Sequence, residues 1–195
     1  MKTSKEYRMQ ALEALRGKYG LAIAIMFVYD LIIAGLTATG IGAIILSGAF
    51  MVGLCVCYLN LMRGKTWKMA DLFAAFSSDF NFSGTIGLSI RMSLRILLWS
   101  LLAIVPGIVA SYRYALAPYI MADNPQISGK EAIEASKALM KGKKGKLFCL
   151  DLSYIGWILL SILTLGILML WVQPRMEAAH AAFYEDAKKV GITER

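Results

Sequence analysis

The stretch IGAIILSGAFMVGLCVCYLNL, from Ile41 to Leu61, contains no charged residue. A helix needs about 20 apolar residues to cross the hydrocarbon core of a bilayer, and this stretch reaches that length. In lipid, only helices and closed barrels can satisfy their backbone groups. The apolar residues show no period-two alternation, so a helix is predicted. Arg63 and Lys65 then return the chain to a basic surface.

The same pattern recurs along a chain that is 58% hydrophobic, above the roughly 45–50% of soluble domains. The predicted crossings are residues 19–36, 41–61, 86–105, 108–121, 147–163 and 167–184. Turns are expected at 37–40, 106–107 and 165–166, and a bend is expected at Pro174. The predicted fold class is therefore all-α, a polytopic membrane protein with six transmembrane helices as three hairpins.

Each hairpin is expected to follow an amphipathic helix that lies at the cytoplasmic interface, starting near residues 3, 66 and 128. Thr3 with Glu6, and Ser128 with Glu131, have the spacing of a capping box. The chain, 1–195, is expected to form one membrane domain with repeat units 3–62, 66–122 and 128–189. The alternative to a true internal repeat is that the three units converged on the same pattern, because any interfacial helix followed by a hairpin produces it.

The basic residues predict the orientation. Segments 1–18, 62–68, 123–146 and 185–195 hold 17 of the 21 Lys and Arg residues, and the three opposite turns hold none. Both termini are therefore expected on the cytoplasmic side of a bacterial plasma membrane, with the N-terminus retained. A single crossing from Ile96 to Met121 would turn the lysine cluster outward, against this rule.

The net charge is +8, and the Lys and Arg residues that carry it lie at the edges of the predicted crossings without interleaved aromatic residues. They are therefore expected to contact anionic lipid and not nucleic acid. Head-group contacts are expected from Lys141, Lys143, Lys144 and Lys146. Other candidate partners are another membrane protein or a second copy of this chain. Small residues such as Ala49 and Gly53 in 41–61 favour packing within one chain, with self-association as the alternative.

Ionisable side chains within the predicted crossings are the candidate functional residues, because they are costly in lipid. They are Asp30, Arg91, Arg95, Arg113 and Asp151. Asp30 lies about 16 Å deep, at 1.5 Å per residue. It is expected either to lock helices through an Asp–Arg pair or to line a polar path. Arg91 and Arg95 could instead lie at the cytoplasmic interface below Trp99, and Asp151 is expected to pair with Lys144 or Lys146.

No catalytic residue, metal site or cofactor is predicted. The chain has no Gly-x-Ser-x-Gly, His-Glu-x-x-His, phosphate-binding glycine loop or Cys-x-x-Cys. Cys55 and Cys57 point to nearly opposite faces of one helix, so buried inert thiols are expected. Arg175, Glu177 and His180 follow Pro174 with helical spacing and are interpreted as a solvated or interfacial face.

The last third of the chain resembles the bacterial integral-membrane family known as domain of unknown function 975. The residues that carry the resemblance are Met121-Ala122-Asp123-Asn124-Pro125, Glu131-Ala132, Ser136, Leu139-Met140-Lys141-Gly142, Lys146-Leu147-Phe148, Asp151-Leu152-Ser153-Tyr154-Ile155-Gly156-Trp157, Thr164-Leu165-Gly166-Ile167 and Ala182-Phe183-Tyr184. Pro106-Gly107-Ile108 and Leu15-Arg16-Gly17 are similar too. Arg175 departs from the aromatic or apolar residue expected after Pro174. A weaker likeness, to the membrane portion of glycerophosphodiester phosphodiesterases, implies no activity.

Three functions remain open. A non-enzymatic accessory or scaffold protein is favoured by the small outer turns and the three basic amphipathic helices. A small transporter or channel, with Asp30 and the arginines along a path, is the alternative. An intramembrane enzyme acting on lipid has the least support.

Overall fold

The computed structural model describes the chain apart from residues 38–40, 103, 165 and 194–195, and it leaves undescribed the side chains of 41–45, 101–102, 104–105 and 191–193. The described residues form helices and short connections, with no strand among them. The elements are α1 (Ser4–Leu15), α2 (Tyr19–Thr37), α3 (Ile41–Met62), η1 (a 3-10 helix, Met69–Phe76), α4 (Phe82–Leu102), α5 (Ile104–Tyr114), α6 (Ala117–Asp123), α7 (Gly129–Leu139), α8 (Lys144–Leu152), α9 (Ile155–Leu163) and α10 (Met169–Thr193). The predicted all-α class is confirmed.

Two helical segments of the described chain are long and apolar enough to cross a membrane. They are Tyr19–Thr37 and Lys144–Leu163, and Leu46–Met62 is a shorter apolar segment. This result associates the chain weakly with a membrane. It does not establish six crossings.

The first two predicted crossings coincide with α2 and α3, but the predicted crossing 108–121 is wrong as a single helix. Helix α5 ends at Tyr114 and α6 begins at Ala117, with Pro118 in the first turn of α6. A proline has no backbone N–H to donate to the carbonyl four residues earlier, and its ring clashes with that carbonyl. Pro118 therefore separates the two helices.

The turn predicted at Pro106-Gly107 is also misplaced, because both residues lie inside α5. Proline is tolerated in the first turn of a helix, where backbone N–H groups have no intrahelical acceptor. In the turn predicted at 37–40, Thr37 is the last residue of α2, and 38–40 lie outside the described residues, as does residue 165. Gly166 has a φ of +85°, which a glycine adopts without strain.

The fifth predicted crossing is divided into two helices, and the sixth continues beyond its predicted end. Helix α8 stops at Leu152, where the Ser153 hydroxyl donates to the Leu150 carbonyl at 2.6 Å, and α9 resumes at Ile155. A hydroxyl that competes for a backbone carbonyl favours such an interruption. Helix α10 contains Pro174 and continues through the charged tail to Thr193.

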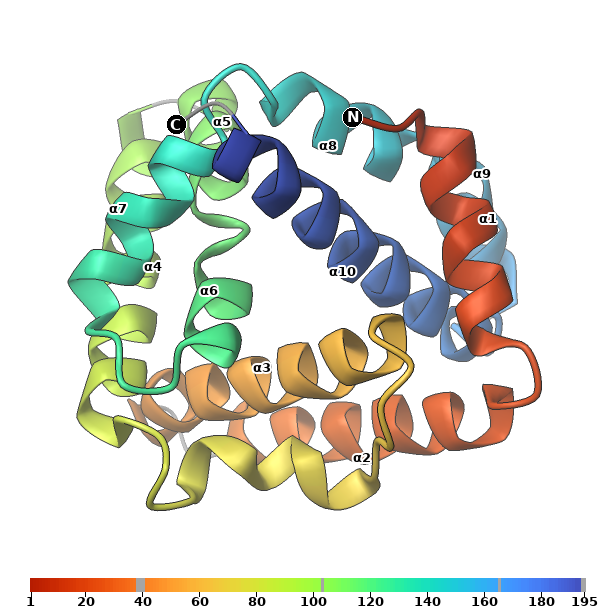
Figure 1. Cartoon of the computed structure of the whole chain (residues 1–195), viewed down its shortest axis with the longest axis horizontal. Helices are drawn as coiled ribbons and strands as arrows, with labels where there is room; N and C mark the ends of the chain where they lie inside the picture. The colour runs from red at the N-terminus through yellow and green to blue at the C-terminus, as the bar shows by residue number, and fades with distance from the viewer. Residues whose placement is uncertain (38–40, 103, 165, 194–195) are drawn as a thin grey trace.

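Helix α10 crosses the middle of the molecule and packs against α1, α2, α3, α7 and α8 (Figure 1). Small side chains occupy its central part: Ala178, Ala179, Ala181, Ala182 and Ala187 are all buried. Because alanine adds only one carbon beyond the backbone, neighbouring helices can approach α10 closely. The core of the protein is thus built around this helix.

Two of the predicted amphipathic helices, α1 and α7, bury one face against other helices of the chain. In α1, Tyr7, Ala11 and Leu15 are buried, and the Tyr7 ring lies 5.4 Å from the Phe183 ring of α10. The buried face of α7 packs against α4 and α6. Helical spacing predicts which face of such a helix is apolar, but an apolar stripe can face either lipid or a protein neighbour. Both predicted capping boxes are present.

Element η1 packs directly on α3. A Cβ on Gly53 would lie 1.9 Å from the Leu72 carbonyl oxygen, so only glycine allows this approach. Phe50 of α3 contacts the rings of Phe73 and Phe76 at 5.6 and 5.1 Å. Gly53 therefore serves packing within the chain, as predicted for this small-residue position.

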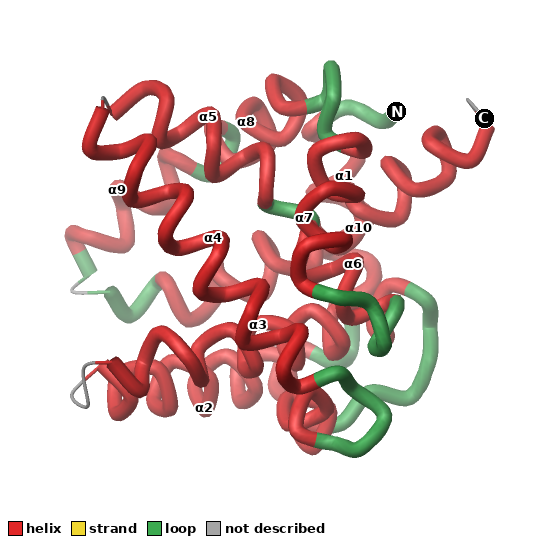
Figure 2. Tube along the Cα trace, turned by 90° about the vertical axis from the view of Figure 1, so that its left-hand side faces the viewer, coloured by secondary structure: helices red, strands yellow, loops and turns green. Residues whose placement is uncertain are grey.

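Three pairs of consecutive helical segments pack together: α2 with α3, α4 with α5, and α9 with α10. In Figure 2 the C-terminal ends of α2, α4 and α9 lie on the left of the molecule. Helices α1 and α7 and the C-terminal end of α10 lie toward the right. We call these pairs the three hairpins.

Candidate functional site

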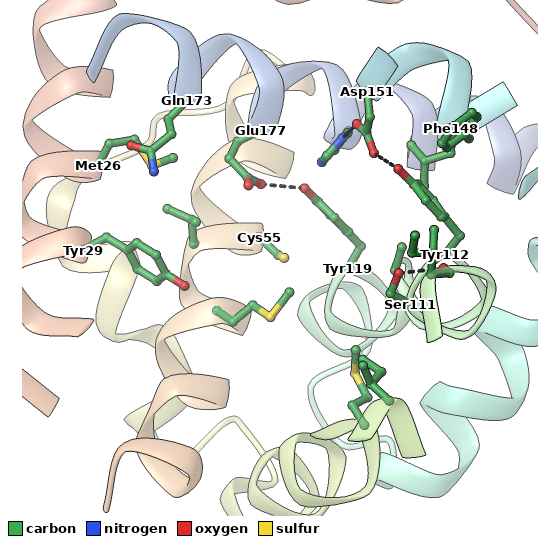
Figure 3. A pocket seen from close by; sticks show the side chains of 18 residues that line it. Met26, Tyr29, Cys55, Ser111, Tyr112, Tyr119, Phe148, Asp151, Gln173 and Glu177 are labelled. Atoms are coloured by element: carbon green, nitrogen blue, oxygen red, sulfur yellow. Dashed lines mark hydrogen bonds and ion pairs between the residues drawn. The ribbon is translucent and has the colours of Figure 1, made fainter. Parts of the chain in front are cut away.

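A cavity of about 690 Å³ lies between the three hairpins, and each of them contributes to its wall (Figure 3). Its size falls within the range of about 300–1,000 Å³ typical of ligand pockets. Most of the lining is apolar or aromatic, including Met26, Met51, Met92 and Phe148. The polar groups on the wall are Tyr29, Ser111, Tyr112, Tyr119, Asp151, Gln173, Glu177 and His180.

Helix α10 supplies one polar stripe of this wall. Gln173, Glu177 and His180 follow one another at spacings of four and three residues, which places them on one face of a helix. The structure brings all three to the cavity. Glu177 and His180 thus lie half-buried on the wall of a cavity, a position that helical spacing alone does not specify.

Asp151 joins α8 to α5 and α10 across the cavity. The Tyr112 hydroxyl donates to Asp151 Oδ2 at 2.8 Å, and His180 Nε2 lies 2.6 Å from Asp151 Oδ1. The Asp151 and His180 side chains each keep 24% of their surface accessible. Asp151 thus pairs with His180. The expected pairing of Asp151 with Lys144 or Lys146 is not formed.

Glu177 is held from the other side of the cavity. The buried Tyr119 donates its hydroxyl to Glu177 Oε2 at 3.0 Å (Figure 3). The Tyr119 ring also stacks 5.7 Å from the ring of Tyr184. A carboxylate that accepts from a buried tyrosine is fixed in orientation. Because Tyr119 belongs to α6, the helix break at Pro118 helps to present this donor.

The charge of the cavity wall is acidic. Two carboxylates line it, and no Lys or Arg is among the described lining residues. Arg175, although on α10, faces away: its guanidinium lies 5.3 Å over the Tyr19 ring and donates to the Tyr19 hydroxyl. A His–Asp pair can neutralise one carboxylate, which leaves Glu177 with neutral donors.

The described residues contain no group of three or more His, Cys, Asp or Glu that could hold a metal ion. The arrangement can instead attract an organic cation. Carboxylates supply the opposite charge, and the aromatic faces of Tyr29, Tyr112 and Phe148 can contact a cation through their π electrons. His180 and Asp151 can also share or exchange a proton.

The predicted intramembrane residues do not gather into one site. Asp30 hydrogen-bonds with Gln173, and no described arginine forms an ion pair with it, so the predicted Asp–Arg pair is not formed. Arg91 is exposed, with its guanidinium over Gly87. Arg95 lies over the Tyr114 ring at 5.8 Å. Of the five predicted residues, Asp151 alone lines the cavity, and Asp30 reaches its edge through Gln173.

The lysine cluster lies at the surface. Lys141 and Lys146 are exposed, and Lys143 and Lys144 are half-buried. Lys143 Nζ donates to the Ala187 carbonyl at 3.4 Å, which ties the cluster to α10.

A second polar cluster, which sequence reasoning missed, joins the ends of α3, α6 and α10. Asp123 is 9% exposed and pairs with Lys188 and, at 2.7 Å, with Arg63. Arg63 also contacts Glu185 at 2.7 Å. Burial raises the pKa of Asp123, but the hydrogen bonds from Lys188 and Arg63 outweigh it and hold this pKa below its usual value. Asp123 therefore stabilises the fold as a carboxylate.

Comparison with known proteins gives one family match. Residues 101–190 match the family described as Protein of unknown function (DUF975). No curated protein and no solved structure matches the chain, so the likeness to glycerophosphodiester phosphodiesterases finds no support. The matched region contains Tyr112, Tyr119, Asp151, Glu177 and His180, and with them most of the polar wall of the cavity. Residues 101–190 are therefore similar to the DUF975 family of proteins of unknown function.

Proposed function

We propose that this chain is a multi-pass protein of a bacterial cytoplasmic membrane, in which the three hairpins form six membrane-embedded segments. Lys and Arg are concentrated in the segments that precede and follow the hairpins, and the predicted turns within the hairpins hold none, which supports this proposal. Exposed apolar side chains support it as well. Leu97 of α4, and Leu159, Ile162 and Leu163 of α9, are each more than 60% exposed, which suits a lipid neighbour better than water.

Both termini then face the cytoplasm, on the side that carries α1 and α7. The break between α5 and α6 is compatible with insertion because Ala117, Tyr119 and Ile120 are buried within protein. Irregular backbone at membrane depth is tolerated when protein covers it.

The function that the site supports best is binding or transport of a small organic cation with an apolar body. One observation carries this proposal: a cavity of about 690 Å³ between the hairpins has two carboxylates on its wall and no lysine or arginine among its described lining residues. Methionine and aromatic side chains would contact the apolar part of the ligand, and Glu177 would supply the counter-charge. No covalent step is needed, so the proposed role is non-enzymatic.

The accessory or scaffold role is the competing proposal. The basic surface around Lys141 and Lys144 supports it, because a cationic rim suits a membrane surface or an acidic partner. A scaffold would need no saturable site between the hairpins, so a binding measurement separates the two roles.

The test uses the full-length protein purified in detergent, with tetraphenylphosphonium and tetraphenylborate as probes. These two ions have nearly the same shape and opposite charge, so their difference reports the sign of the cavity. We expect saturable binding of the cation and at least about tenfold weaker binding of the anion, measured by equilibrium dialysis. Tenfold corresponds to about 1.4 kcal/mol.

Glu177→Gln is expected to weaken cation binding by about tenfold or more, because it removes a charge that faces the ligand. Glu134→Gln is the matched control, since Glu134 is exposed on α7 and does not line the cavity. Equal binding of both probes, or equal losses in the two variants, would contradict the cation site.

A further inference from the structure

A group of cations lies outside the cavity, where α4, α5 and α7 meet. Arg95 of α4 lies 5.8 Å from the centroid of the Tyr114 ring, and Lys137 of α7 lies 5.9 Å from the same centroid. Arg113 precedes Tyr114 at the end of α5 and is exposed. No described carboxylate forms an ion pair with any of these three cations.

Arg95 is the least satisfied of the three. Its Nη1 atom is buried and has no hydrogen-bond partner among the described residues. A guanidinium carries five N–H donors, and buried donors of a charged group are normally paired. Two cations on one ring also repel each other. An anion placed between them would satisfy the orphaned donor and remove the repulsion.

An apolar groove of about 310 Å³ adjoins these cations. It is lined by Trp99, Pro106, Val109, Ala110 and, at its polar end, Arg113. Trp99 and Val109 are 43% and 46% exposed, so the groove is open to the surroundings of α4 and α5. Tryptophan is enriched at the boundary between lipid head groups and acyl chains.

We infer that this place binds one anionic phospholipid, with its phosphate against Arg95, Lys137 and Arg113 and an acyl chain in the groove. The inference rests on the proposed membrane insertion and is independent of the cation cavity. Charge complementarity selects the head group, because three cations face it without a described acidic partner. The groove selects a lipid over free phosphate, because an ion without a chain would leave the apolar wall unused.

Arg95 and Arg113 are also among the residues considered for a polar path through the membrane. Their positions support a different role: Arg113 is exposed, and Arg95 contacts Tyr114 on the side of α7 and not the cavity. They are better explained as ligands for lipid phosphate at the level of the head groups.

The test compares short-chain didecanoyl phosphatidylglycerol with didecanoyl phosphatidylcholine, titrated into the detergent-purified full-length protein and read by native mass spectrometry. Phosphatidylglycerol is expected to bind about tenfold or more tightly. Glycerophosphoglycerol has the same head group without chains, and it is expected to bind at least about tenfold more weakly than the lipid.

Arg95→Gln and Lys137→Gln are each expected to weaken phosphatidylglycerol binding by about tenfold, since each removes one charge-assisted contact to phosphate. Lys137 is half-buried at the surface of α7, so its variant keeps the test valid if Arg95→Gln does not fold. Lys65→Gln removes an exposed lysine beyond the end of α3, outside the site, and is expected to change binding less than about twofold.

Equal affinity for the two lipids, equal affinity for the chainless head group, or an equal loss in Lys65→Gln would overturn the lipid site. None of these results would bear on the proposed cation site in the cavity, because that site is tested with different probes and variants. The two proposals can therefore fail separately.

Discussion

Replacing Gly53 by alanine tests how closely η1 packs on α3. The added Cβ would lie 1.9 Å from the Leu72 carbonyl oxygen and 2.6 Å from its carbonyl carbon. Non-bonded carbon contacts are favourable at about 3.5–4.0 Å, so the backbone of η1 must move by about 1.5 Å. A flexible side chain could turn aside, whereas a backbone carbonyl can move only with its whole element.

The expected cost follows from two opposing effects. Overpacking of this kind costs about 1–3 kcal/mol, and the backbone contact places Gly53→Ala at the upper end of that range. Alanine in a helix interior returns about 1 kcal/mol relative to glycine. The net loss should be about 2 kcal/mol, or about 4–8 °C in the melting temperature for a chain of this size.

Thermal unfolding followed by tryptophan fluorescence in detergent measures this loss. Gly35→Ala is the matched control, because Gly35 is also helical and a Cβ there would meet nothing within 4 Å. It should be neutral or slightly stabilising. If Gly53→Ala melts with the wild type, or if both variants lose the same stability, the close approach of η1 to α3 is refuted.

Two further variants probe the polar contacts that join the helices. Asp123→Asn should lower the free energy of unfolding by about 2 kcal/mol, because it leaves Arg63 and Lys188 without their shared carboxylate. This loss is smaller than for a fully buried pair because both cations are partly exposed. The folded-state pKa of Asp123 is lowered, so its contribution is present above about pH 4 and is lost as pH falls through the folded pKa. Unfolding curves should therefore differ between wild type and variant at pH 7 and converge in acid, whereas a constant difference would refute this pair. Ser128→Ala should lower the free energy of unfolding by about 1 kcal/mol, because the hydroxyl caps α7 by accepting from the Glu131 N–H; an unchanged value in the same assay would show that the cap is dispensable.

Local features of the fold were predictable because they depend on neighbouring residues. Apolar runs predicted α2, whose one charged residue is Asp30, and α3, which has none. The spacing of Thr3 with Glu6 and of Ser128 with Glu131 predicted the starts of α1 and α7. Pro118 carried a usable signal for the break before α6, since a proline seldom continues a helix. The number of membrane crossings was not predictable at this level.

The candidate site was less predictable because its contacts join residues far apart in the chain. Asp151 meets His180 from 29 positions away, and Tyr119 meets Glu177 from 58 positions away. Intramembrane charge was a sound signal for Asp151, but it also selected Arg95 and Arg113, which lie elsewhere. The spacing of Gln173, Glu177 and His180 was visible in the sequence. Only the three-dimensional packing distinguishes a cavity wall from a solvated face.

The insertion of the three hairpins from the cytoplasmic side is the central claim, and cysteine labelling in intact cells tests it most directly. In a Cys149→Ser background, which removes the exposed native thiol, single cysteines would replace Lys141, exposed beside α7, and Ile167, exposed at the far end of α9. With a membrane-impermeant maleimide, we expect labelling of Ile167→Cys in intact cells and of Lys141→Cys only after permeabilisation. Labelling of Lys141→Cys in intact cells, or recovery of the protein in the soluble fraction, would contradict it.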